Sequence, residues 1–116
     1  MCIEIKKSIV TKKDMIAYKK VKRRNSKTWC SPIEPRMRIP QINRRGVGGI
    51  LKYTIGKVTK SGIPGIYLHI NKPIYCAWDV LRVKIPAGSR CYIGTHGKMT
   101  AERVIPLELV GFVGLV

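Results

Sequence analysis

Cationic side chains are the residues whose type and spacing point most clearly to a chemistry in this sequence. A dense group of them lies between residues 19 and 27 and consists of Lys19, Lys20, Lys22, Arg23, Arg24 and Lys27. Each phosphate that such a side chain neutralises releases condensed counterions, which gives a salt-dependent affinity for nucleic acid without reading its sequence. We therefore expect this group to contact a phosphate backbone. The alternative is that it is only the solvated end of a strand.

A second group of cations lies in a long basic connection, residues 25–49, which contains prolines and glycines that oppose regular strand pairing. Loops of this length are uncommon in compact domains, where they are usually functional or disordered. The further candidate phosphate contacts in it are Arg36, Arg38, Arg44 and Arg45. Because Arg44 and Arg45 precede a glycine-rich stretch, the backbone there could line an anion site, or the loop could simply need positive φ.

Trp29 is the aromatic residue that lies among these cations, and we expect it to be partly exposed and to stack on a nucleic-acid base. For the other aromatic residues considered, the strand patterns around them predict a core or sheet-face role: Tyr53, Tyr67, Tyr75, Trp78 and Tyr92. Aromatic residues make up 7% of the chain, and no single strand is rich in them in the way of an RNA-recognition sheet.

Residues suited to catalysis or metal binding are few and scattered. The six acidic residues form no close carboxylate pair for general acid–base work, and the four cysteines form no CxxC pair. We therefore predict no enzyme activity, no metal, no cofactor and reduced cysteines. The alternative is a Cys–His site assembled from distant residues, for which the candidates are Cys30, Cys76, Cys91, His69 and His96.

The charge balance indicates the class of partner. The formal net charge is +17, and 17 of the 23 Lys and Arg residues lie in the first 60 positions. A large excess of positive charge destabilises a fold by self-repulsion. The excess is therefore most simply explained by a polyanionic partner: nucleic acid, an acidic protein surface or anionic lipid. No apolar run reaches the roughly 18 residues of a membrane span, and the start does not read as a secretory signal. We expect a soluble, cytoplasmic protein without membrane contact.

Short alternating segments are the elements that must position these side chains, and they predict a β-dominated α+β fold. We expect a single domain over residues 1–116, with an antiparallel sheet of about six strands and little helix beyond one turn within 71–78. A hairpin should join residues 50–59 to 66–70, and Pro106 should put the last strand at an edge or in a bulge. The predicted strands are 2–10, 15–23, 50–59, 66–70, 81–85, 90–93 and 102–110.

The apolar C-terminal residues lack a place in this scheme, because a last strand closing on the core uses only Ile105, Leu107 and Leu109. A soluble chain seldom leaves such a patch in water. We expect the remaining side chains to be buried, either by folding back or in a homodimer: Phe112, Val113, Leu115 and Val116.

Five short stretches carry a family resemblance: Met15–Val21, Tyr53–Lys57, Gly65–His69, Val83–Arg90 and Ala101–Leu109. Together they resemble small bacteriophage-encoded domains of unknown function, which typically open with a Tyr-Lys-Val strand and close with an Ile-Pro-Ala turn before a charged strand. The resemblance implies a viral origin and no particular activity.

These observations predict a non-enzymatic, phage-type basic protein that binds nucleic acid, DNA or RNA, mainly through the phosphate backbone. The alternative is a phage anti-defence protein, similar in role to an anti-CRISPR, that uses the same basic face to bind and inhibit an acidic host protein or ribonucleoprotein. Both hypotheses depend on the charge and differ in the partner.

Overall fold

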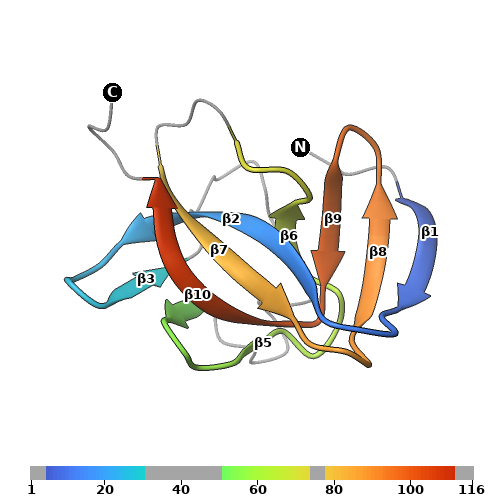
Figure 1. Cartoon of the computed structure of the whole chain (residues 1–116), viewed down its shortest axis with the longest axis horizontal. Coiled ribbons are helices and arrows are strands. Elements are labelled where there is room, and N and C mark those ends of the chain that lie inside the picture. Colours follow the sequence, from blue (N-terminus) through green and yellow to red (C-terminus); the bar gives the residue numbers. More distant parts are fainter. Residues whose placement is uncertain (1–4, 31–50, 74–77, 112–116) are drawn as a thin grey trace.

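The computed structural model describes residues 5–30, 51–73 and 78–111, and within these residues every regular element is a strand. The strands, which Figure 1 colours along the chain, are β1 (Ile5–Val10), β2 (Met15–Arg23), β3 (Thr28–Cys30), β4 (Lys52–Thr54), β5 (Thr59–Lys60), β6 (Ile66–His69), β7 (Asp79–Ile85), β8 (Arg90–Gly94), β9 (Lys98–Ala101) and β10 (Arg103–Gly111).

All neighbouring strands are antiparallel, in the order β1-β8-β9-β6-β2-β7-β10-β5, with β3 pairing β2 and β4 pairing β3. The long strands β2, β7 and β10 curve across the molecule side by side, and β6, β9, β8 and β1 continue the sheet at one end (Figure 1). The chain passes from one part to the other where β9 leads into β10 at Glu102.

Alternation along the strands separates a buried face from an outward face. On β2, Ala17, Lys19 and Val21 are buried, whereas Tyr18 and Lys20 between them are only partly covered. Burying one large apolar side chain contributes about 1.5–3 kcal/mol. The buried faces meet in one hydrophobic cluster formed by Ala17, Val21, Trp29, Tyr53, Ile66, Leu68, Leu81, Val83, Ile85, Cys91, Met99, Ala101 and Val104.

The β-dominated, antiparallel part of the predicted fold class is confirmed, while the α+β label is not supported, because the described residues contain no helix. Residues 5–30, 51–73 and 78–111 form ten strands instead of the expected six or so. The strands predicted at 66–70, 81–85, 90–93 and 102–110 are present as β6, β7, β8 and β10 within one or two residues at either end. The first element, β1, begins at Ile5 within the described residues.

The prediction of one continuous strand over residues 50–59 is wrong. A turn separates β4 from β5 because Gly56 has a φ of +83°, and its N–H donates to the carbonyl of Pro106 at 2.9 Å. The hairpin expected between this segment and 66–70 is also absent, since β5 pairs with β10 and β6 pairs with β9 and β2. Strand β9 was not predicted, because its four residues are too few to show a pattern.

Pro106 lies in a bulge, which was one of the two positions predicted for it, the other being the edge of the sheet. Two residues of β10, Pro106 and Leu107, occupy the space of one residue on β7, so the pairing moves from Val83 to Arg82 with a one-residue slip. The strand is not at the edge of the sheet near Pro106, because β7 lies along it and β5 pairs with its first residues.

The connection predicted at 25–49 begins with structure rather than with a loop, since β3 lies inside it and pairs with β2. Its remaining part, the C-terminal residues 112–116 and residues 74–77 of the segment predicted to hold a helical turn lie outside the described residues. The predicted homodimer contact through Phe112 to Val116 therefore stays a prediction. The described part of the chain holds no helix with the length and hydrophobicity to traverse a bilayer.

Substitutions at Gly56 test the turn that separates β4 from β5. A Cβ at this position would meet nothing within 4 Å, so any cost arises from the backbone conformation alone. Gly56→Val should lower the free energy of unfolding by about 1–3 kcal/mol, whereas Gly56→Asn should cost less because Asn tolerates positive φ. Urea denaturation measures both, and equal losses for the two variants would contradict the left-handed turn.

Candidate nucleic-acid interface

The hairpin formed by β2 and β3 presents four of the predicted phosphate contacts to solvent. Its register pairs Lys22 with Cys30 and Arg23 with Trp29. At the tip, the Asn25 side-chain oxygen accepts hydrogen bonds from the backbone N–H groups of Lys27 and Thr28, both at 2.9 Å, an arrangement that fixes a tight turn. The exposed cations of this hairpin are Lys22, Arg23, Arg24 and Lys27, which we call the hairpin cations.

Trp29 anchors the base of the hairpin instead of offering a face to a ligand. Its side chain is 4% exposed, and its indole N–H donates to Asp79 Oδ2 at 2.8 Å. Arg23 Nε donates to the same carboxylate oxygen at 2.9 Å, and the Arg23 guanidinium lies 5.6 Å from the centre of the Trp29 ring. The prediction that Trp29 is partly exposed is wrong, because the buried Asp79 carboxylate satisfies its only polar group within the core.

Lys19 is also placed differently from its prediction as a phosphate contact. It shares the buried face of β2 with Ala17 and Val21, and it is 6% exposed. Burial, followed by the charge of Lys20, lowers the pKa of Lys19 to about 8. Successive side chains of a strand point to opposite faces, so Lys19 points inward and Lys20 points outward.

A second cationic surface covers the outward side of β2, β6, β9 and β8. Across these strands Tyr18 pairs with His69 and His69 with Lys98, while Thr100 pairs with both Tyr67 and Tyr92. Paired residues of antiparallel strands project from the same side of a sheet. The resulting surface, which we call the outer face, consists of Tyr18, Lys20, Tyr67, His69, Tyr92, Lys98 and Thr100.

The rings and cations of the outer face are in mutual contact. The Tyr67 and His69 rings meet edge to face with centroids 5.8 Å apart, and the Lys98 ammonium lies 5.9 Å from the Tyr67 ring centre. Partial burial, followed by the charges of Lys20, Lys98 and Lys19, lowers the pKa of His69 to about 4. His69 is therefore neutral at pH 7, and the positive charge of the outer face comes from its lysines.

Three of the four acids in the described part of the chain pair with cations outside these surfaces, and the fourth, Asp79, pairs with the hairpin cation Arg23. Each of the four acids in the described part of the chain has a cationic partner: Asp14 with Lys84 at 3.9 Å, Asp79 with Arg23 at 2.9 Å, Glu102 with Arg90 at 3.2 Å, and Glu108 with Arg82 at 3.2 Å. No ion pair within the described residues involves Lys20, Lys22, Arg24 or Lys27. The cations on the outward side of β2 and at the hairpin tip thus keep their charge uncompensated.

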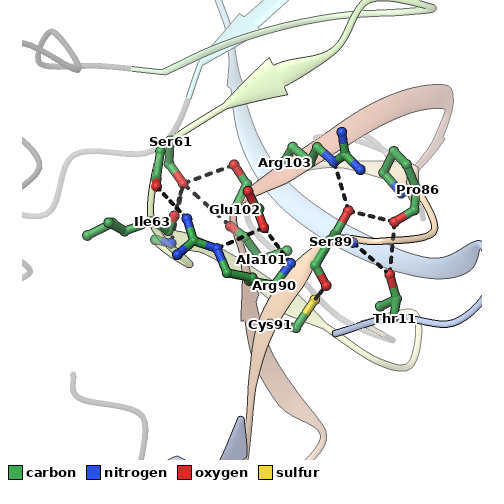
Figure 2. A network of polar contacts seen from close by, with 12 residues as sticks. Thr11, Ser61, Ile63, Pro86, Ser89, Arg90, Cys91, Ala101, Glu102 and Arg103 are labelled. Carbon is green, nitrogen blue, oxygen red and sulfur yellow. Dashed lines mark hydrogen bonds and ion pairs between the residues drawn. The ribbon is translucent and has the colours of Figure 1, made fainter. Parts of the chain in front are cut away.

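A polar network at the bend between β9 and β10 collects several hydroxyl groups without forming a catalytic arrangement (Figure 2). Arg103 Nε donates to Ser89 Oγ at 2.9 Å, and the Thr11 hydroxyl donates to the carbonyl of Pro86 at 2.9 Å. Glu102 accepts from the backbone N–H and the side chain of Arg90, which holds its pKa below the usual value. These contacts join three turns, so we assign the network a structural role.

Other features that catalysis or metal binding would use are not brought together among the described residues. Cys30 and Cys91 are buried free thiols, and burial with the nearby Glu102 charge raises the pKa of Cys91 to about 11. Within residues 5–30, 51–73 and 78–111, no three His, Cys, Asp or Glu side chains are grouped to hold a metal ion. Cys76 lies outside these ranges.

The remaining predicted site residues, Arg36, Arg38, Arg44 and Arg45, lie outside the described residues. Of the outer face, only Lys20 was among the predicted site residues. Tyr67 and Tyr92 were predicted to have a core or sheet-face role, and Tyr18 was not among the predicted stacking candidates. The available signal was the alternation of aromatic and basic residues at Tyr18–Lys20 and Tyr67–His69, but their meeting depends on pairing between distant strands.

Comparison with known proteins adds no relative, because the chain matches no family model, no curated protein and no solved structure. The resemblance to phage domains therefore stays a prediction.

Replacing Asp79 tests the anchor of the hairpin. Asp79→Ala leaves the buried Trp29 N–H without its acceptor, which should lower the free energy of unfolding by about 1–3 kcal/mol. Asp79→Asn keeps an acceptor at this position and should cost less. Chemical denaturation measures both variants, and an Asp79→Ala protein as stable as the wild type would show that the contact is dispensable.

The titration of His69 tests the charge of the outer face. NMR should give a midpoint of about 4, and Lys20→Met should raise it by removing a neighbouring positive charge. Because the unfolded chain takes up this proton near pH 6.5, stability should fall as the pH drops from about 6.5 to about 4. His69→Gln should remove that part of the pH dependence, whereas a wild-type midpoint near 6.5 would contradict the clustering of cations around the imidazole.

Proposed function

We propose that this protein is a non-enzymatic nucleic-acid-binding protein that contacts mainly the phosphate backbone. The observation that carries the proposal is the unpaired charge along β2 and at the hairpin tip. Asp79 pairs with Arg23 and the other three described acids pair outside the hairpin, whereas Lys20, Lys22, Arg24 and Lys27 have no acidic partner among the described residues. Like charges held together without compensation destabilise the fold. A polyanion bound there relieves this repulsion.

The geometry of β2 supports one continuous binding surface. Lys20 and Lys22 alternate along the same side of this strand, so the outer face leads directly to the hairpin cations. The hairpin turn is held by backbone hydrogen bonds, including Arg24 N–H to the carbonyl of Thr28 at 3.0 Å, which keeps the tip in place before a ligand arrives. A preformed row of point charges suits phosphate contacts that carry no sequence specificity.

The same charge would suit an acidic host protein, as in the anti-defence alternative for a phage-encoded chain. Oligonucleotides of defined length separate the two partners directly. Counterion release makes the logarithm of nucleic-acid affinity fall linearly with the logarithm of the salt concentration, in proportion to the number of phosphates neutralised.

Removing three hairpin cations tests the proposal. A variant with Lys22→Ala, Arg24→Ala and Lys27→Ala should bind a labelled DNA duplex more weakly, and its log–log salt slope should flatten by about 2–3 units. Fluorescence anisotropy at a series of salt concentrations measures the slope.

The matched control removes the same charge from other exposed turns through Lys12→Ala, Lys13→Ala and Lys57→Ala. This control should keep a slope close to that of the wild type. Equal slopes for both triple variants would mean that the hairpin is not the contact, and an absence of binding to duplex and single strands alike would refute nucleic-acid binding.

A further inference from the structure

We propose that the nucleic acid is single-stranded and that its bases stack on the tyrosines of the outer face, Tyr18, Tyr67 and Tyr92. This inference rests on the proposed function and adds the form of the ligand and the residues that hold its bases. Lys20 and Lys98, on the same face, are placed to contact the phosphates between successive bases.

Three separate strands contribute the tyrosines: β2 supplies Tyr18, β6 supplies Tyr67 and β8 supplies Tyr92. All three side chains are half-buried, which leaves part of each ring accessible on a rigid sheet. Tyr67 and Tyr92 flank Thr100 from the two strands next to β9, and neighbouring strands lie about 4.8 Å apart, so these positions are separated by about 10 Å. Unstacked bases of a single strand can reach such a face, whereas the paired bases of a duplex cannot.

Thr100 is an independent sign that the outer face is incomplete without a ligand. Its side chain lies between Tyr67 and Tyr92, it is 8% exposed, and its hydroxyl oxygen has no hydrogen-bond partner. Among the described residues, this oxygen is the one buried side-chain polar atom without a hydrogen-bond partner. Buried polar groups are normally satisfied, and the edge of a base that enters between the two rings would bring donors and acceptors to this hydroxyl.

The distribution of charge limits the proposed binding surface to the outer face. On the outward side of β7, Arg82 pairs with Glu108 and Lys84 pairs with Asp14, so acids are present there. On the β6 and β9 side, the Lys98 ammonium lies over the Tyr67 ring, and the charges of Lys20, Lys98 and Lys19 act together on the neutral His69. A polyanionic strand is therefore favoured over β2, β6, β9 and β8 and disfavoured beyond β7.

Paired substitutions at Tyr67 test stacking separately from charge. The probes are labelled oligothymidylate, oligouridylate and a DNA duplex of the same length, measured by fluorescence anisotropy at a series of salt concentrations. Tyr67→Leu should weaken binding of a single strand about 5- to 150-fold and leave its salt slope unchanged, while Tyr67→Phe keeps the ring and should stay within about twofold of the wild type. Tyr92→Leu should repeat the loss, and duplex affinity should change little in any of these variants.

The two single-stranded probes distinguish DNA from RNA as the source of the ligand, and tighter binding of either one supports the inference. Equal binding of single strand and duplex, with Tyr67→Leu unchanged, would overturn the stacking inference while the salt-slope result for the hairpin cations still stands. Failure of every oligonucleotide to bind would refute the proposed function itself.

A measurement on the unmodified protein guards against variants that fail to fold. Phosphates held beside Lys20 and Lys98 would raise the pKa of His69, because they reduce the positive potential that these lysines, together with Lys19, impose on the imidazole. NMR titration with saturating oligothymidylate should therefore move the His69 midpoint upward. An unchanged midpoint at saturation would place the strand elsewhere and overturn the inference.

Discussion

The antiparallel ladder between β2 and β7 is the constraint on which both the core and the candidate interface depend. It pairs residues without a break from Met15 with Ile85 to Val21 with Asp79. This register turns Ala17 and Val21 toward the core and Tyr18 and Lys20 outward, and a slip of one residue would exchange the two faces. It also brings Asp79 to the base of the hairpin, where its carboxylate accepts from both Trp29 and Arg23. The hairpin cations thus extend from a strand that is held on both sides.

The chain has a net charge of +17 and few acidic residues. The positions of these acids allow the chain to stay folded while part of its surface keeps an unpaired positive charge. Asp79 joins a buried anchor, and Glu102 joins the bend between β9 and β10, where its carboxylate also holds a backbone N–H. Exposed ion pairs such as Arg82 with Glu108 add little stability, so their main effect is to reduce the positive charge near β7. Along β2 and its hairpin, Lys20, Lys22, Arg24 and Lys27 remain without an acidic partner among the described residues.

Prediction from the sequence succeeded where one strand carries enough alternating residues to reveal its period. The segments that became β2, β7 and β10 were found, and the bulge at Pro106 followed from its missing N–H. Short elements failed: β3, β5 and β9 have two to four residues, too few for a pattern. Trp29 was misplaced because its cationic neighbours in sequence suggested exposure, while the carboxylate that buries it comes from position 79.

The sequence by itself determined the positive charge, its bias toward the first half of the chain and the alternation within individual strands, since these properties are local and are set by residue type and spacing. Only the tertiary structure decided which cations remain without acidic partners and which aromatic rings share a face. Tyr18, Tyr67 and Tyr92 belong to strands far apart in the chain and meet through β6 and β9. Strand pairing between distant segments depends on how the whole core closes, so no local pattern around any one of these tyrosines specifies its neighbours.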